Sequence, residues 1–282
     1  MNALEITELS KSFPGFRLEH INLTLPSGCI MGLIGENGAG KSTTIKLILN
    51  MLHKDSGSIT VLGRNNEKDI RLIKEEVGVV MDETGIPQCL TPKQVERIMR
   101  HTFRNWNYRE YTRLLDKFSI PPYRPFHEFS RGTKMKLGIA IAMSHGSRLL
   151  LLDEATNGLD PLVRDEVLEM FSEFTRDENH SILLSSHIVS DLEKICDYVA
   201  FLHKGKLLLC EEKDLLLAQY GIIHCTAEQL RELNPAAVRY QKKTPYGVEA
   251  MVMRNAVPSY IEVSPINMEE LFIYMAREEK PI

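Results

Sequence analysis

The sequence predicts an α/β domain with a mostly parallel sheet, a helical insert and a small α+β tail. Short apolar segments alternate with helical ones along most of the chain, which is the pattern of parallel sheets. Amphipathic helical spacing interrupts this alternation at residues 91–118, and from about residue 211 strand and helix patterns are mixed. We therefore expect a main domain over residues 1–210, with its helical insert at about 91–145, and an appendage over residues 211–282.

The strands of the main domain are marked by short alternating or apolar segments. Residues 3–9 alternate, whereas residues 29–34 form an apolar run that continues into a glycine, as expected of a buried strand. Residues 148–153 are mostly leucine and end in a carboxylate. Further strands are expected at residues 58–62, 77–81, 181–185 and 198–203, and one in the tail at residues 248–253.

Helical spacing fills the segments between these strands. Thr91 and Pro92 form a helix-start signal, because proline fits the first helical turn. A second amphipathic segment at residues 111–118 ends before two consecutive prolines, which break helices. Other helices are expected at residues 41–52, 132–145, 161–176 and 188–195, and in the tail at residues 214–220 and 267–277.

Composition limits the class of protein. Of the 282 residues, 43% are hydrophobic and 26% charged, a balance that allows an adequate core without disulfides. The formal net charge of −4 argues against a dedicated nucleic-acid binder, which usually carries a basic excess. Five cysteines without a C-x-x-C pair fit a reducing cytosol better than a disulfide framework or a zinc site.

The sequence gives no sign of a membrane span. The first ten residues are polar and mixed, so we do not expect a secretion signal. The longest apolar stretches are far shorter than the roughly 20 residues that a spanning helix needs. Any membrane role is therefore expected to come through a partner.

The strongest motif follows the strand at residues 29–34. It fits the pattern G-x-x-x-x-G-K-[ST], in which glycines bring backbone N–H groups against phosphate oxygens. The helix that follows points its positive end at the same phosphates, lysine reaches the β- and γ-phosphates, and the serine hydroxyl can bind Mg²⁺. The predicted nucleotide-binding residues here are Gly35, Glu36, Asn37, Gly38, Ala39, Gly40, Lys41, Ser42 and Thr43.

Two carboxylates, Asp153 and Glu154, follow the leucine-rich strand. Ligands of open α/β sheets bind at the carboxyl ends of strands, where such side chains gather. One carboxylate can serve a metal while the other serves the attacking water. Taken alone, this stretch favours the alternative, an acidic pair at a helix start after a core strand.

Together these motifs resemble the ATP-binding subunits of ABC transporters over about residues 4–209. The resemblance implies a P-loop NTPase fold with an antiparallel β subdomain and a helical subdomain. It implies that Asp153 holds Mg²⁺ together with Ser42, and that Glu154 acts as the general base in ATP hydrolysis. It also implies a switch role for His187, at the end of a strand, whose neutral imidazole can hydrogen-bond the γ-phosphate.

Two short segments resemble further family motifs. Residues 129–133 are similar to a divergent ABC signature, in which arginine replaces the first glycine and threonine the glutamine; by itself the segment is an ordinary helix cap. In the family this motif binds the γ-phosphate of ATP held by the other subunit. Residues 157–160 resemble the D-loop. The candidate residues are Ser130, Arg131, Gly132 and Thr133 for the signature, and Asn157, Gly158, Leu159 and Asp160 for the D-loop.

Phe13 matches the aromatic residue that stacks on adenine in the family, although a plain core aromatic is the alternative. The match breaks at Asp82, where the family has a glutamine that senses Mg²⁺ and the attacking water. Aspartate still offers an oxygen ligand, so we expect Asp82 to contact Mg²⁺ in the closed state. A second departure is Ala155, where the family often has proline.

The resemblance predicts an Mg²⁺-dependent ATPase that powers transport, with export favoured because residues 264–272 resemble the ending of exporter-type subunits. The expected partners are a separately encoded transmembrane permease and a second ATP-binding subunit, so the protein would lie in the cytoplasm on the inner face of the membrane. The helical insert is the expected docking face. The alternatives are a non-transport ABC ATPase with a regulatory or nucleic-acid role and a nucleotide kinase.

Overall fold

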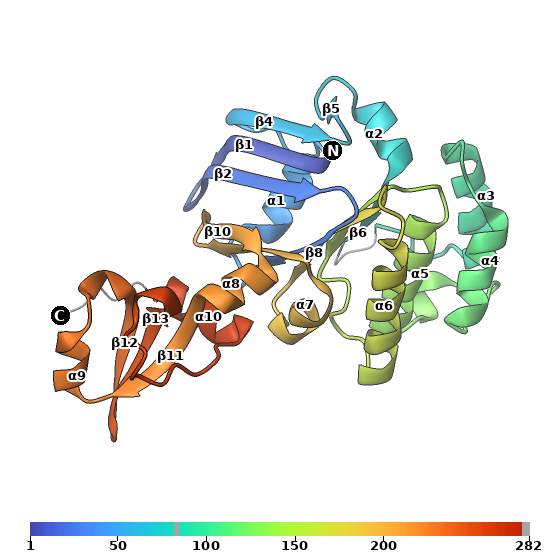
Figure 1. Ribbon diagram of the computed structural model, residues 1–282. Helices are drawn as coiled ribbons and strands as arrows, with labels where there is room; N and C mark the ends of the chain where they lie inside the picture. Colours follow the sequence, from blue (N-terminus) through green and yellow to red (C-terminus); the bar gives the residue numbers. More distant parts are fainter. Residues whose placement is uncertain (82–84, 278–282) are drawn as a thin grey trace. The chain divides into compact units, whose positions relative to one another are not determined.

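The computed structural model describes residues 1–81 and 85–277, which are arranged in two compact units (Figure 1). The first unit is Met1–Leu207 and the second is Leu208–Ile282. Strand β10 (Lys206–Glu212) leads from the first unit into the second.

The centre of the first unit is a parallel sheet. Strands β9 (Tyr198–His203), β3 (Ile30–Ile34), β8 (Ser181–Ser186), β7 (Leu149–Asp153) and β6 (Val77–Val80) lie next to one another in that order, each parallel to its neighbour. Every residue of β3, β7 and β8 is buried, as expected of strands covered on both faces. Because Ile34 pairs with Ser186 and Asp153 with Ser185, the carboxyl ends of these strands form one edge.

An antiparallel part continues the sheet. It contains β1 (Asn2–Phe13), β2 (Phe16–Pro26), β4 (Ser56–Val61) and β5 (Arg64–Asn65), and the complete order is β5-β4-β1-β2-β10-β9-β3-β8-β7-β6. The antiparallel pairs are β1 with β2, β1 with β4, and β4 with β5. The α/β fold with a large, mostly parallel sheet is thus confirmed, and the sheet carries the antiparallel part that the resemblance implied.

The helices of the first unit are close to the predicted ones. They are α1 (Lys41–Ile48), α2 (Ile70–Glu76), α6 (Pro161–Phe174) and α7 (Val189–Ile195) in the main domain, and α3 (Pro92–Thr102), α4 (Tyr108–Lys117), η1 (Phe126–Glu128) and α5 (Arg131–Met143) from the insert onward. Thr91 caps α3 with a reciprocal capping box to Gln94, which confirms the predicted start. None of the helices in the described part of the chain is long and apolar enough to cross a membrane.

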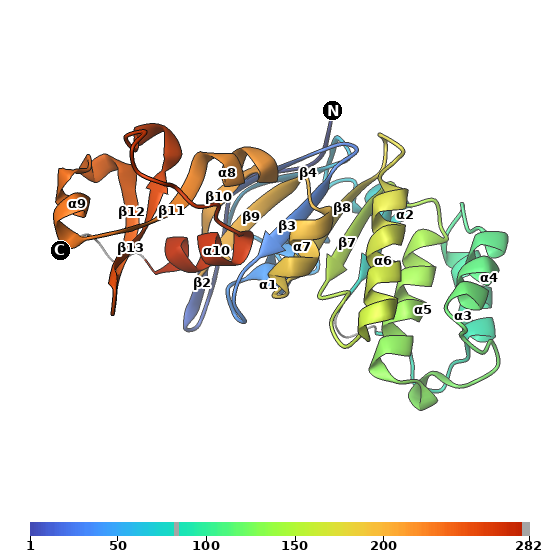
Figure 2. The same ribbon diagram turned by 60° about the horizontal axis from the view of Figure 1, so that its bottom comes forward.

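Helix α5 connects the helical insert to the sheet. Figure 2 shows α3, α4 and α5 side by side, and α5 packs on β6. A Cβ atom at Gly78 of β6 would lie 2.5 Å from the carbonyl oxygen of Ala142. A side chain there would therefore push the end of α5 off the strand, so glycine is needed for this packing.

The second unit has its own small sheet and core. Strands β11 (Tyr220–Cys225), β13 (Gly247–Met253) and β12 (Val238–Thr244) form an antiparallel sheet in that order, and the helical elements are α8 (Lys213–Gln219), α9 (Ala227–Glu232), η2 (Pro235–Ala237), η3 (Arg254–Ala256) and α10 (Met268–Ala276). The predicted strand and both predicted helices of the tail are present. The flanking strands β11 and β12 were not predicted.

Candidate nucleotide-binding site

The glycine-rich loop between β3 and α1 depends on two residues in the left-handed region. Gly38 has a φ of 81° and Gly40 a φ of 115°, values that side chains disfavour. A Cβ atom at Gly40 would also lie 2.8 Å from Leu18 Cδ1 and 3.1 Å from Phe16 Cζ. The loop can therefore bend in front of α1 and present its backbone N–H groups only with glycine at these positions.

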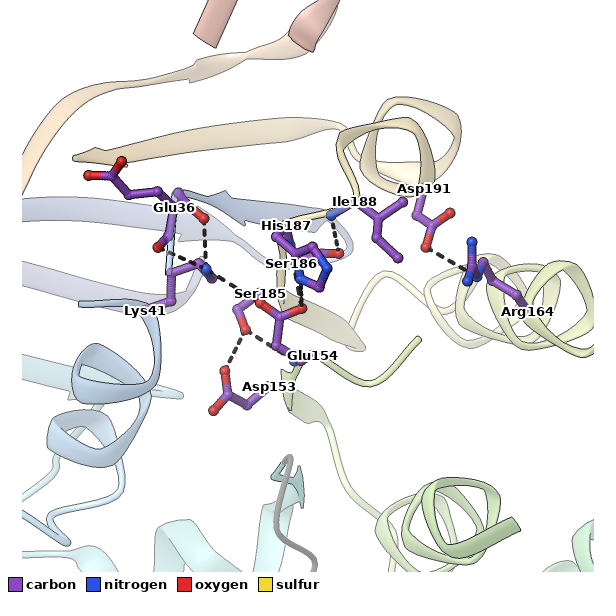
Figure 3. Close-up of polar contacts among 11 residues, drawn as sticks. Glu36, Lys41, Asp153, Glu154, Arg164, Ser185, Ser186, His187, Ile188 and Asp191 are labelled. Carbon is purple, nitrogen blue, oxygen red and sulfur yellow. Dashed lines mark hydrogen bonds and ion pairs between the residues drawn. The ribbon is translucent and has the colours of Figure 1, made fainter. Parts of the chain in front are cut away.

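Lys41, the first residue of α1, is 6% exposed and already bound within the loop. Its ammonium donates to the carbonyl oxygens of Gly35 at 2.7 Å and Glu36 at 3.3 Å. It also pairs with Glu154 Oε1 at 3.4 Å (Figure 3). Phosphate oxygens could take the place of these carbonyl and carboxylate oxygens as partners of the buried ammonium.

The carboxyl ends of β7 and β8 bring the predicted acidic and imidazole groups together. Asp153, 2% exposed, accepts a hydrogen bond from Ser185 Oγ at 2.6 Å. Glu154 has a φ of 54°, a conformation that costs energy for a residue with a side chain, and its Oε2 lies 2.7 Å from His187 Nδ1. Figure 3 shows Glu154 between Lys41 and His187.

Lys41, Glu154 and His187 face one cavity of about 560 Å³, whereas Asp153 is not among its described lining residues. Its size is within the roughly 300–1,000 Å³ of small-molecule sites. It is lined by Phe16, Glu36, Asn37, Gly38, Gly40, Lys41, Ser42, Thr43, Glu154, Asn157 and His187. The structure thus brings most of the predicted cradle residues together with Glu154 and His187.

The aromatic residue that lines this cavity is Phe16, which the sequence analysis missed. Phe13 was predicted instead, and its ring centroid lies 6.4 Å from that of Phe16. The two rings face each other across the β1–β2 turn, so only the fold decides which one meets the loop. Close to the same loop, His203 Nδ1 lies 3.2 Å from Glu36 Oε1, a contact that no motif indicated.

The signature segment lies against Gly158 of the D-loop and outside this cavity, whereas Asn157 of the D-loop lines the cavity. Ser130 caps α5 by accepting from the Thr133 N–H at 3.2 Å. A Cβ atom at Gly132 would lie 3.2 Å from the carbonyl oxygen of Gly158. Among the described residues that line the cavity, none belongs to residues 130–133.

Other contacts hold the D-loop. Asp160 caps α6, accepting from the Val163 N–H at 3.1 Å. Arg164 of α6 donates to the Leu159 carbonyl at 3.3 Å and lies 3.9 Å from Asp191 Oδ2 on α7 (Figure 3). The loop after Glu154 is therefore linked to the helix that follows His187. The predicted Mg²⁺ contact of Asp82 falls outside the described residues.

The oxygen donors at this edge suit Mg²⁺. Ser42 supplies a hydroxyl in the cavity, and Asp153 supplies a buried carboxylate that Ser185 orients. Mg²⁺ in nucleotide sites is bound through one or two carboxylates, water and phosphate oxygens rather than by a full protein cage. The described residues accordingly contain no cluster of three or more His, Cys, Asp or Glu that could enclose a metal.

Comparison with known proteins agrees with this geometry. The ABC transporter family model matches residues 18–157. The chain is 36% identical to a lantibiotic transport ATP-binding protein of Streptococcus pyogenes over 75% of this chain and 91% of that protein. It is 29% identical to the ABC transporter ATP-binding protein YtrB of Bacillus subtilis over 96% of this chain and 97% of that one.

A solved structure of an ATP-binding subunit of an ABC transporter superposes with a TM-score of 0.70 at 28% identity, covering 77% of this chain and 92% of that one. The glycine-rich loop, the paired carboxylates and His187 lie within the part of the chain that these relatives share. The chain therefore belongs to the ABC transporter ATP-binding proteins, the ATP-hydrolysing subunits of these transporters.

Proposed function

We propose that this protein is the Mg²⁺-dependent ATPase of an exporter, in which two ATP-binding subunits work with a separately encoded permease. The observation that carries the residue roles is the contact of Glu154 with both Lys41 and His187 at the glycine-rich loop. This contact supports the proposal that a carboxylate, a cation and an imidazole meet the terminal phosphate of a bound nucleotide.

Glu154 is proposed as the general base. In the described state its two oxygens contact Lys41 and His187. Phosphate oxygens are better partners for the lysine ammonium than loop carbonyls, so a nucleotide in the cradle would draw Lys41 away from Glu154. The freed carboxylate oxygen could then accept a proton from the attacking water, while His187 holds the other oxygen.

The remaining cradle residues bind and orient. The N–H groups of Lys41, Ser42 and Thr43 lie in the first turn of α1, where the helix dipole favours an anion. Ser42 and Asp153 are the residues that would hold Mg²⁺, whose charge would offset that of the phosphates. Phe16 offers an apolar wall next to the loop for the base of the nucleotide.

A pair of subunits follows from the position of the signature. Ser130 and Gly132 lie outside the cavity formed by their own chain, yet they combine a hydroxyl and backbone N–H groups at a helix start, which is an anion site. A head-to-tail pair would place this segment over the nucleotide of the other copy. We propose two identical copies.

The membrane partner is proposed from two findings. No described helix can cross a membrane, and relatives of similar length are named transport ATP-binding proteins. A permease must then supply the path for the transported molecule, and this chain would act on the cytoplasmic side, where ATP is found. Export is favoured by the likeness of residues 264–272 to exporter-type subunits.

The test is Glu154→Gln, which keeps the shape of the side chain and removes its basicity. We expect ATP binding to persist and turnover to fall by about 10²-fold or more, the usual effect of losing a general base. ATP should also accumulate a dimer, measurable by size-exclusion chromatography with light scattering. Glu166→Gln, on the exposed face of α6, is the matched control. Ordinary turnover in Glu154→Gln would defeat the assignment.

Asp82 remains a proposal based on its position in the sequence. If it contacts Mg²⁺ during turnover, Asp82→Ala should require several-fold more Mg²⁺ for half-maximal ATPase rate than the unmodified protein, since one oxygen ligand is lost. An unchanged Mg²⁺ dependence would refute the contact.

A further inference from the structure

A second pocket lies within the helical insert and is lined by residues of α3, α4 and the segment that follows α4. Figure 2 shows where these two helices lie. The volume of the pocket is about 130 Å³, and it shares no described lining residue with the nucleotide cavity. Since drug-sized ligands occupy roughly 300–1,000 Å³, this pocket fits a group the size of a side-chain head. It is lined by Lys93, Glu96, Tyr108, Tyr111, Thr112, Leu115, Asp116, Ile120, Pro122 and Tyr123.

Glu96 gives the pocket a buried carboxylate with one oxygen unused. The residue is 1% exposed, and Arg100 donates two hydrogen bonds to its Oε1, at 2.5 and 2.9 Å. Within the described residues, Oε2 receives no hydrogen bond. Buried carboxylate oxygens are normally hydrogen-bonded, so Oε2, which Lys93 approaches to 3.6 Å, is an acceptor that a better-placed donor entering the pocket could satisfy.

Three tyrosines surround this acceptor. Tyr111 is buried and fixed by donating from its hydroxyl to the Pro92 carbonyl at 3.0 Å; burial and the charge of Glu96 raise its pKa, so it stays neutral. Tyr108 and Tyr123 are 45% and 77% exposed and form the rim. Aromatic faces attract organic cations, particularly when a carboxylate lies behind them.

A lysine side chain of the protein itself already lies near the carboxylate and the tyrosine face of this pocket. Lys93 Nζ lies 4.9 Å from the centroid of Tyr108 and 3.6 Å from Glu96 Oε2, too far for a hydrogen bond. Its side chain is 39% exposed, so it can move aside. Asp116 adds a second carboxylate to the lining, and the two acidic groups are balanced by Lys93 and by Arg100. Arg100 pairs with Glu96 and lies 5.6 Å from the centroid of Tyr108. An incoming cation would therefore have to take the place of Lys93.

We propose that this pocket binds the guanidinium or ammonium group of an arginine or lysine side chain presented by a polypeptide partner. The cation donates to Glu96 Oε2 and lies against the face of Tyr108, displacing Lys93 toward solvent. The aliphatic stem of the incoming residue passes between Tyr108 and Tyr123 at the rim. The inference does not depend on the nucleotide site or on which protein presents the residue.

The chain contains its own reporter of occupancy. Trp106 is the single tryptophan, and its ring centroid lies 5.1 Å from that of Tyr111. Its fluorescence is followed while the full-length protein, without nucleotide, is titrated with the capped tripeptide acetyl-Ala-Arg-Ala-amide. The corresponding lysine peptide is the second probe, and the citrulline peptide, neutral and of the same shape, is the control. Saturable binding of the two cationic peptides and none of citrulline is expected.

Variants then locate the binding. Glu96→Gln should weaken the arginine peptide by about tenfold or more, as expected for a lost hydrogen bond to a charged group. Glu110→Gln removes a carboxylate of α4 that pairs with Arg113 outside the pocket, and should leave binding unchanged. Lys93→Met should tighten binding by about twofold or more, because the resident cation no longer competes. A merely structural role of Lys93 predicts no tightening.

Glu96→Gln could also unfold the insert, since Arg100 loses part of its partner. Circular dichroism detects that outcome, and the exposed substitutions Asp116→Asn and Tyr123→Ala then carry the test; each should weaken the arginine peptide. Equal binding of the citrulline and arginine peptides, or affinities that no pocket variant changes, would overturn the proposal. Its failure would leave the ATPase assignment untouched, since Lys41 and Glu154 play no part in the measurement.

Discussion

The glycine-rich loop and the signature segment both lie at a helix start, yet their surroundings differ. The loop before α1 faces a cavity that its own chain closes with Glu154, Asn157 and His187. Gly132, in the first turn of α5, lies against Gly158 of the D-loop instead, and the hydroxyl of Ser130, the N-cap of α5, accepts from the Thr133 N–H. One chain thus contains a complete cradle for a nucleotide and only one half of the site that would cover it.

This difference indicates that nucleotide binding and ATP hydrolysis have different requirements. The cradle can hold a nucleotide without help, because its lysine, glycines and carboxylates belong to one unit. Under the proposed function, closure over the terminal phosphate would need a segment from a second copy, since residues 130–133 do not line the cavity of their own chain. Turnover is therefore expected to depend on protein concentration, whereas nucleotide affinity is not.

The most damaging change to the complete site is Lys41→Ala. The ammonium that would neutralise the phosphates is lost, together with the contact that holds Glu154 in the resting state. We expect ATP affinity to fall by about 10²-fold, in line with the loss of a buried charge-assisted contact. Equilibrium binding of a fluorescent ATP analogue measures it, with Lys46→Ala, later on α1, as the control. Unchanged ATP affinity in Lys41→Ala would contradict the proposal that the glycine-rich loop binds the phosphates.

The incomplete site is tested by mixing two inactive chains. Ser130→Asp keeps a good helix cap but puts a negative charge where a phosphate should bind, so turnover should be lost while ATP binding remains. An equal mixture with Lys41→Ala forms pairs in which one composite site is intact. About one quarter of the wild-type ATPase rate should return, if subunits pair at random with two-fold symmetry. A mixture as inactive as its components would break the comparison between the two sites.

The smallest expected effect distinguishes two neighbouring aromatic rings. Phe16→Ala removes a wall of the cavity and should weaken ATP by about tenfold, the value of a lost aromatic contact. Phe13→Ala should change ATP affinity less than twofold if only Phe16 meets the nucleotide. Isothermal titration calorimetry at one Mg²⁺ concentration compares them. The reverse order would restore the assignment made from sequence.

Features that depend on residues close together in the sequence were predicted, whereas features that depend on contacts between distant residues were missed. The loop at residues 35–42 was predictable because its geometry is set by the glycines inside it. Asp153, Glu154 and His187 were placed because the ends of parallel strands share an edge. In contrast, β2 was missed, since polar residues such as Glu19 and His20 interrupt its apolar alternation and its pairing with β1 shifts register.

Phe16 shows the limit most clearly. Its place beside Gly40 results from the turn between β1 and β2 and from the packing of Leu18 under the loop. The Pro14-Gly15 pair marks the turn in the sequence, but the approach of Phe16 and Leu18 to Gly40 is made only in the fold. The pocket around Glu96 escaped for the same reason, because its acceptor and its tyrosines come from two helices and the segment that follows them.

The close approach of Gly132 to Gly158 bears on how two nucleotide sites could be coupled. A Cβ atom at Gly132 would crowd the carbonyl oxygen of Gly158, so the start of α5 and the loop ahead of α6 form one closely packed piece. Through Arg164 that piece is also connected to the helix that follows His187. If Ser130 contacts a nucleotide held by a second copy, loss of that contact would be transmitted to His187 of the same chain, and hydrolysis at the two sites would be coupled.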